Sequence, residues 1–157
     1  MYMKRQLLSL TFISCLLSFS PIGALAQTGL KMNDLFQGRI IPQERMVETR
    51  VRGKSLEKYH LTFYRSLRMN VTPEECTQLG QLLDKDKAVS IDLRSHRGNP
   101  HSWKTYTCKM QLPPSGGKSR YLCYREQWNA RHDQCEVTVI YMEGTVSSLE
   151  QLEKLLK

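Results

Sequence analysis

Alternation of apolar and polar side chains in the second half of this chain restricts its local structure more than any other feature. Between Thr105 and Leu112 the apolar side chains occupy the even-numbered positions and the polar ones the odd-numbered positions. This pattern predicts a strand from Trp103 to Leu112 with one buried face. The stretch PPSGGKS, residues 113–119, predicts a hairpin turn, and residues 120–128 and 135–142 predict two further strands. The three strands together predict an antiparallel meander.

Two helices are predicted by their first turns. Thr72 supplies an N-cap, Pro73 occupies the first helical position, and Glu75 completes a capping box. Cys76 would then face the core. A second capping box at residues 147–150 precedes an apolar stripe that runs to the C-terminus. A helix with one apolar stripe should dock on the sheet.

The first half of the chain adds further strands. Residues 46–52 and 59–69 alternate, with a helical turn predicted at 55–58, and residues 30–37 predict a short helix. The expected fold class is α+β: an antiparallel sheet that includes a C-terminal three-strand meander, packed by a central helix and a C-terminal helix.

The first 26 residues have the three parts of a secretory signal peptide. Lys4 and Arg5 are followed by an apolar segment and then by Ala24-Leu25-Ala26, a small-residue cleavage site. The apolar segment is shorter than the roughly 20 residues that a membrane span needs. We therefore expect cleavage after Ala26 and a single exported domain over residues 27–157, in the periplasm or outside the cell. A lipoprotein-type site at Phe12-Ile13-Ser14-Cys15 is the alternative processing route.

The expected mature chain is basic. Cleavage removes two positive residues and no acidic one, so 21 Lys and Arg remain against 15 Asp and Glu, a net charge of +6. A basic surface attracts an envelope polysaccharide, anionic lipid or an envelope protein. Export argues against nucleic acid as a partner. The positive residues are dispersed along the chain, which also fits an ordinary solvated surface.

Four cysteines remain after cleavage: Cys76, Cys108, Cys123 and Cys135. An even number in an exported chain predicts disulfides. A hairpin closed around residues 113–119 would place Cys108 opposite Cys123, which leaves Cys76 to pair with Cys135. A register shift of one residue would instead put Cys108 and Cys123 on opposite faces. A free reactive thiol at Cys76 or Cys135 is a further possibility.

The stretch RSHRGNPHSW, residues 94–103, is the main candidate for a binding loop. Its candidate ligand-binding residues are Arg94, His96, Arg97, Asn99, His101 and Trp103. The two histidines could fold onto one metal ion, but no third ligand is placed by its spacing. We therefore predict no metal and no cofactor, and the alternative is a plain connection set by its glycine and proline.

Trp103 also offers an aromatic face on which a sugar ring could stack. Aromatic residues on the neighbouring predicted strands could extend that surface: Tyr106, Tyr121, Tyr124 and Trp128. The alternative is that these side chains form the core of the sheet, where aromatic residues contribute most burial.

No catalytic residue is predicted. Ser102 lacks the GxSxG turn of hydrolase nucleophiles, and the Gly116-Gly117-Lys118-Ser119 stretch lacks the first glycine of a P-loop. Cys135 with His132 is explained more simply as a disulfide partner beside a loop residue. We interpret the chain as a non-enzymatic binding or interaction module. The alternative is an envelope hydrolase that uses His96, His101 or His132.

The signal segment, the small basic domain and the stretch LFQGRIIPQERMVETRVRGKSLEKYHLTFYRSLRM resemble the uncharacterised exported proteins of the Bacteroidetes. The resemblance is one of overall character and carries no functional motif. It implies a bacterial envelope or secreted protein and assigns no site residues.

Overall fold

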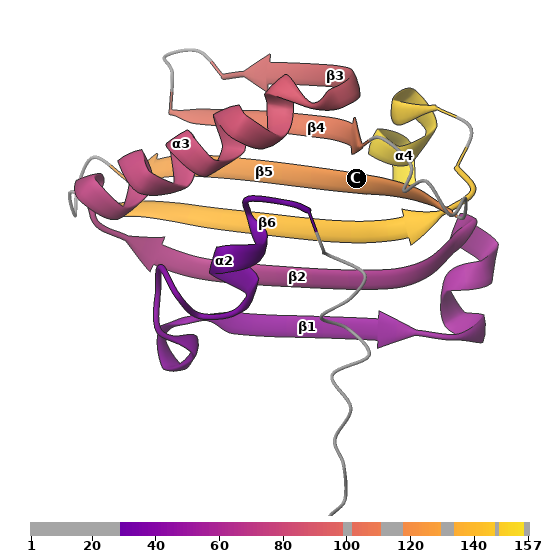
Figure 1. The fold of residues 1–157 in the computed structure, drawn as a ribbon, viewed down its shortest axis with the longest axis horizontal. Helices are drawn as coiled ribbons and strands as arrows, with labels where there is room; N and C mark the ends of the chain where they lie inside the picture. The colour runs from indigo at the N-terminus through magenta and orange to yellow at the C-terminus, as the bar shows by residue number, and fades with distance from the viewer. Residues whose placement is uncertain (1–28, 99–101, 111–117, 130–133, 147, 156–157) are drawn as a thin grey trace, which may run out of the picture.

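The computed structural model describes residues 29–98, 102–110, 118–129, 134–146 and 148–155, and within them six strands form one antiparallel sheet (Figure 1). The strand order is β1-β2-β6-β5-β4-β3, so β1 and β3 are the edges. The strands are β1 Val47–Arg52, β2 Leu61–Val71, β3 Ser90–Arg97, β4 Trp103–Met110, β5 Ser119–Asn129 and β6 Gln134–Gly144. The predicted α+β class and the β4-β5-β6 meander are therefore confirmed.

One edge strand was not predicted. Arg94, His96 and Arg97 lie in β3 rather than in a loop. The strand escaped recognition because it has no buried face: Ile91 and Leu93 are 59% and 42% exposed. A strand that is exposed on both sides carries no alternation for the sequence to display.

One face of the sheet, here called the α3 face, is covered by α2 Asn33–Phe36 and α3 Pro73–Ala88 (Figure 1). The predicted capping box begins α3. The Glu75 amide donates to Thr72 Oγ1 at 3.3 Å, and the Thr72 amide donates to Glu75 Oε2 at 3.0 Å. Buried residues of the larger core on this face include Phe36, Leu67, Leu79, Met110, Leu122, Tyr124, Val137, Val139 and Tyr141.

The opposite face, here called the α4 face, is covered only in part, by α4 Leu149–Leu155 and the 3-10 helix η2 Lys54–Tyr59. The predicted C-terminal helix is confirmed, and η2 matches the predicted helical turn. The Gln151 amide donates to Ser148 Oγ at 3.2 Å, so Ser148 caps α4; Ser147 lies outside the described residues. A second 3-10 helix, η1, spans Gln43–Arg45. Within the described part of the chain, no helix is long and apolar enough to cross a membrane.

A buried arginine ties β2 to β1 and α2. Arg65 is only 7% exposed. Its Nε donates to Glu48 Oε1 at 2.8 Å, and its Nη2 donates to the Phe36 carbonyl oxygen at 2.9 Å. Burial alone would raise the pKa of Glu48, but hydrogen bonds from Arg65 and Arg50 bring it below the ordinary value of 4.5. Glu48 therefore supplies the counter-charge for a guanidinium that is removed from water.

Glu48→Gln should lower the free energy of unfolding by about 1–2 kcal/mol near neutral pH, because Arg65 loses its counter-charge. A carboxylate whose pKa is lowered by folding contributes its full stability above the unfolded-state value of 4.5 and loses it as the pH falls through the folded-state pKa. The stability gap between wild type and variant should therefore narrow in acid. Urea unfolding of both proteins from neutral pH to about pH 3 measures this gap. A difference in the free energy of unfolding that stays the same at every pH would show that the charge of Glu48 does not stabilise the fold.

Candidate functional site

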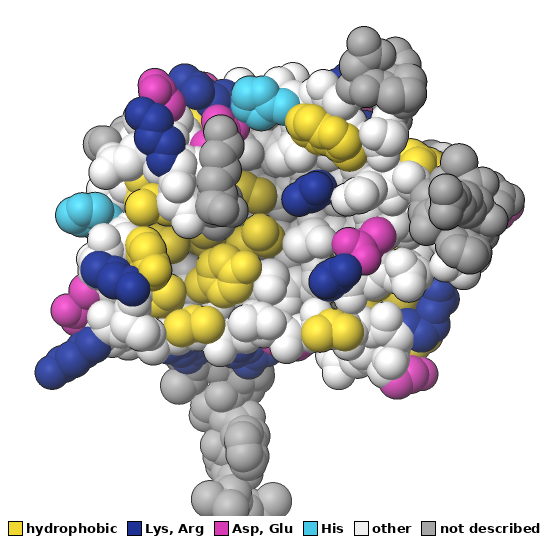
Figure 2. Space-filling view, turned by 180° about the vertical axis from the view of Figure 1, so that it is seen from behind, with side chains coloured by type: hydrophobic (Ala, Val, Ile, Leu, Met, Phe, Trp, Pro, Cys, Tyr) yellow, Lys and Arg dark blue, Asp and Glu magenta, His cyan; other side chains and the backbone are white. Residues whose placement is uncertain are grey.

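A groove of about 480 Å³ lies on the α4 face, where α4 leaves the sheet uncovered. Its lining residues are His96, Trp103, Thr105, Thr107, Cys123, Arg125, Thr138, Ile140 and Glu153. Figure 2 views this face, with Lys and Arg side chains in dark blue near its middle, close to hydrophobic side chains in yellow. The groove is therefore a mixed polar and aromatic surface rather than a purely apolar one.

The strand register aligns the floor of the groove in rows. His96 pairs with Thr105, Thr105 with Arg125, and Arg125 with Thr138, so one row crosses β3, β4, β5 and β6. Side chains of paired residues lie about 4.5–5.5 Å apart at their β-carbons. Four side chains that can donate or accept hydrogen bonds therefore form one continuous line across the sheet.

Trp103 forms the aromatic wall of the groove, and Gly98 sets its position. The Gly98 amide donates to the Trp103 carbonyl oxygen at 3.0 Å across the β3–β4 connection. A β-carbon at position 98 would overlap the indole ring of Trp103. The ring therefore lies directly against the glycine backbone, and the absence of a side chain there fixes where the ring can lie.

Gly98→Ala should push the indole of Trp103 out of its present position while leaving the fold intact, because only a side chain has to move. In a Trp128→Phe background, the fluorescence of Trp103 should shift to longer wavelength as the ring becomes more exposed. The free energy of unfolding should change by less than about 1 kcal/mol, as for other surface substitutions. Emission that is unchanged by Gly98→Ala would show that the ring does not rest on this glycine.

Helix α4 forms the opposite wall through Glu153. Its Oε1 lies 3.2 Å from His96 Nε2, and its Oε2 lies 3.7 Å from Arg94 Nη1. Arg94 also lies 3.8 Å from Glu150 of the same helix. These contacts place a carboxylate beside the imidazole and attach α4 to the edge strand.

The structure brings together some of the predicted ligand-binding residues and separates others. His96 and Trp103 line the groove, and Arg94 lies beside it. Arg97 points to the α3 face, where its Nη2 donates to the hydroxyl of Tyr106 at 3.3 Å. Asn99 and His101 lie outside the described residues.

The remaining predicted aromatic surface is not present on the α4 face. Tyr121 and Tyr124 are fully buried, which supports their interpretation as core residues. Trp128 is 36% exposed and donates to Glu126 on the α3 face. Sequence patterns did not identify four residues of the groove as binding residues: Thr105, Arg125, Thr138 and Glu153. Of these, only Thr105 had been assigned to the polar side of a predicted strand.

One of the two predicted cysteine pairs, Cys108 with Cys123, is not brought together. Cys108 pairs with Leu122 and Thr107 with Cys123, so Cys108 and Cys123 lie on opposite faces of the sheet and the predicted bridge between them is wrong. The hairpin register differs by one residue from the predicted one, and one residue reverses the face of every side chain. Burial raises the pKa of both thiols to about 12, so Cys123 is a poor nucleophile in the groove.

Cys76 and Cys135 are brought into contact across the α3 face. Their sulfur atoms lie 3.9 Å apart, and all four described cysteines are free thiols. Cys135 is also a poor candidate for a catalytic nucleophile paired with His132. The hydrogen bond with Cys76 and burial both raise the pKa of its thiol, which disfavours the reactive thiolate. His132 lies outside the described residues.

A family model described as a family of unknown function, DUF6108, matches residues 19–156. The searches of curated proteins and of solved structures found no match.

Proposed function

The chain belongs to this family of unknown function, and we propose that it is a non-enzymatic binding module of the bacterial envelope that holds an acidic polysaccharide in the groove of the α4 face. The observation that carries the proposal is the row of His96, Thr105, Arg125 and Thr138 next to the indole of Trp103.

These side chains match the chemistry of an acidic sugar. An indole ring packs on the apolar face of a pyranose, and threonine hydroxyls both donate and accept hydrogen bonds. The guanidinium of Arg125 can bind a carboxylate or sulfate in a bidentate manner. The positive charge of the expected mature chain would also attract a polyanion. A line of polar side chains across the floor, beside one aromatic wall, fits a sugar chain better than a lipid tail.

The groove favours binding over hydrolysis. Most glycosidases use two carboxylic acids that flank the scissile bond. Glu153 is the single carboxylate among the described residues that line the groove, and it contacts His96. That contact is the observation in favour of the hydrolase alternative. The lining offers no partner carboxylate to share the chemistry.

The proposal is tested by titrating residues 27–157 with a galacturonic acid hexamer and with the neutral galactose hexamer. The acidic sugar should bind more tightly, and Trp103→Ala should weaken its binding by at least about tenfold. Arg125→Gln should remove the preference for the acidic sugar. Arg39→Gln is the matched control, because Arg39 is an exposed arginine outside the groove, and it should change nothing.

Three outcomes would overturn the proposal. The first is equal affinity for the acidic and the neutral hexamer. The second is binding that Trp103→Ala leaves unchanged, including binding to anionic vesicles, which would indicate a lipid partner and a different surface. The third is release of shortened sugars that His96→Ala abolishes, which would establish the hydrolase.

A further inference from the structure

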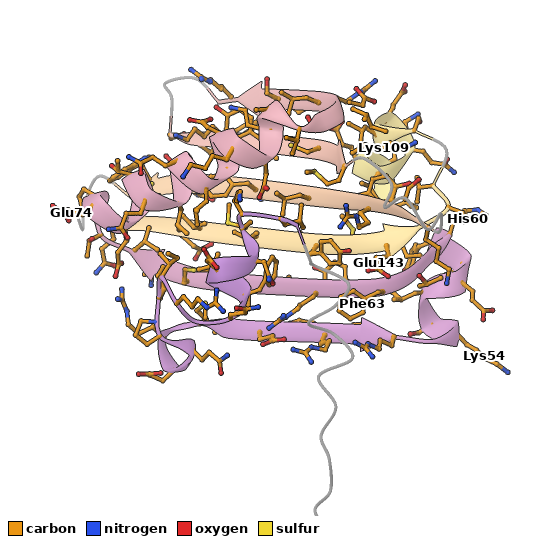
Figure 3. All side chains as sticks on the ribbon, viewed as in Figure 1. Lys54, His60, Phe63, Glu74, Lys109 and Glu143 are labelled. Carbon is orange, nitrogen blue, oxygen red and sulfur yellow. The ribbon has the colours of Figure 1, made fainter. Side chains whose placement is uncertain are left out.

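A second cluster of functional side chains lies on the α3 face, below the first turn of α3, and the proposed sugar groove does not use it. Cys76 comes from α3, Glu126 from β5 and Cys135 from the beginning of β6. Glu74 marks this end of α3 in Figure 3. One ligand atom from each of the three residues lies within 4.8 Å of the other two.

The cluster is removed from water. Cys76 is 7% exposed, Glu126 is 3% exposed and Cys135 is fully buried. Cys135 pairs with Val71 at the end of β2, directly before α3 begins, which is why a helix residue and a strand residue meet here. Buried thiols and a buried carboxylate from three separate elements form the kind of ligand set that thiophilic metals select.

We propose that Cys76, Cys135 and Glu126 bind a zinc ion, with a water molecule as the fourth ligand. Zinc–sulfur bonds are about 2.3 Å long, so two sulfurs at the observed 3.9 Å subtend an angle of about 116° at the metal, close to tetrahedral. The thiols lose their protons to solvent as the metal binds. A disulfide, which the sequence predicts here, would require the sulfurs to approach to about 2.05 Å.

The surroundings of Glu126 fit a metal ligand. Its Oε2 accepts hydrogen bonds from Tyr124 at 3.1 Å and from Lys104 at 3.0 Å, and its Oε1 accepts one from Trp128 at 2.8 Å. A carboxylate has about four acceptor positions, so one remains for the metal. Donors of this kind orient ligating carboxylates in metal sites.

The charges of the site also balance. Two thiolates and one carboxylate carry three negative charges, and a zinc ion together with the ammonium of Lys104 carries three positive ones. A neutral sum matters because net charge in a buried site is costly. Without the metal, protonated thiols and the Lys104–Glu126 pair are neutral as well, so the site can exist in both states.

A cleft leads from solvent to the carboxylate of the site. A cleft of about 220 Å³ is lined by Glu126 together with Arg97, Trp103, Lys104 and Trp128. An ion can therefore reach the carboxylate without unfolding of α3. An entry path is one of the requirements for a metal site.

The test uses the reduced full chain, freed of metal with a chelator and titrated with Co²⁺ and then with Zn²⁺. One equivalent of Co²⁺ should produce a thiolate-to-cobalt charge-transfer band, and Zn²⁺ should remove it by displacement. Cys76→Ala and Cys135→Ala should each lower zinc affinity by at least about 100-fold, and Glu126→Gln by about tenfold. Cys108→Ala and Cys123→Ala are matched controls at the other two buried cysteines and should leave the affinity unchanged.

Absence of the band in the reduced wild-type protein would overturn the proposal, and that result requires no variant to fold. A band that survives Cys135→Ala would overturn it as well. Without the metal, the contact would be no more than the hydrogen bond between the two thiols. The outcome is separate from that of the sugar titration, since none of the three proposed zinc ligands lines the sugar groove.

Discussion

Replacing Asp86 with alanine should lower the free energy of unfolding by about 3 kcal/mol, because a buried carboxylate that accepts two hydrogen bonds is removed. Asp86 is fully buried near the end of α3. Its Oδ1 accepts from the Lys31 amide at 2.7 Å, and its Oδ2 accepts from the Met32 amide at 2.8 Å. The carboxylate therefore holds the segment before α2 onto α3, and its loss leaves these amides without an acceptor.

Asp84→Ala is the matched control for this prediction. Asp84 lies on the same helix, its side chain is 72% exposed, and it pairs with Lys87 one turn away. Exposed helical pairs of this kind contribute little, so the change should stay within about 0.5 kcal/mol. Urea unfolding of the three proteins measures both effects. Equal stability of the two variants would show that Asp86 is not an anchor.

Gly144→Ala should lower the free energy of unfolding by roughly 3 kcal/mol through a backbone clash. A β-carbon at position 144 would overlap the carbonyl oxygen of His60 and lie 2.9 Å from Leu61 Cα. That carbonyl cannot retreat freely, because it accepts a hydrogen bond from the Thr145 amide at 2.8 Å. Figure 3 shows His60 at the end of the sheet opposite Glu74. The start of β2 and the end of β6 would have to separate.

The same substitution at Gly80 is the control, and it should raise the free energy of unfolding instead of lowering it. A β-carbon at Gly80, within α3, meets no atom within 4 Å. Alanine is preferred over glycine in a helix by roughly 0.5–1 kcal/mol, so Gly80→Ala should stabilise the protein. Thermal unfolding of both variants measures the difference. Tolerance of Gly144→Ala would contradict the close approach described for this strand pair, and destabilisation by Gly80→Ala would contradict the open surroundings described for Gly80.

Local patterns made most of the fold predictable. The alternation before Leu112 predicted strand β4, and the Thr72 capping box predicted the start of α3, and both elements are present in the structure. The edge strand β3 was missed because its apolar residues are exposed. The signal peptide and its cleavage after Ala26 remain predictions.

The sites were less predictable, since both depend on strand register. His96 and Trp103 were recognised by residue type alone, whereas Arg125 and Thr138 join them only through the pairing of β4, β5 and β6. The predicted pairing of β4 with β5 was wrong by one residue, which produced the wrong bridge between the cysteines. Glu126 had an available signal: it is an acid on the inward side of β5. When strand alternation places a carboxylate in the core, that carboxylate needs a positively charged partner or a metal, because an unpaired buried charge is costly.

The most direct test of the binding proposal is to map where the sugar contacts the protein. Backbone amide and tryptophan indole N–H chemical shifts of residues 27–157 should be recorded while the galacturonic acid hexamer is added. We predict that the largest changes fall on Thr105, Arg125 and Thr138, which share one row of the sheet, and on the indole of Trp103. Changes confined to α3 and its face of the sheet, or no changes at saturating sugar, would contradict the account.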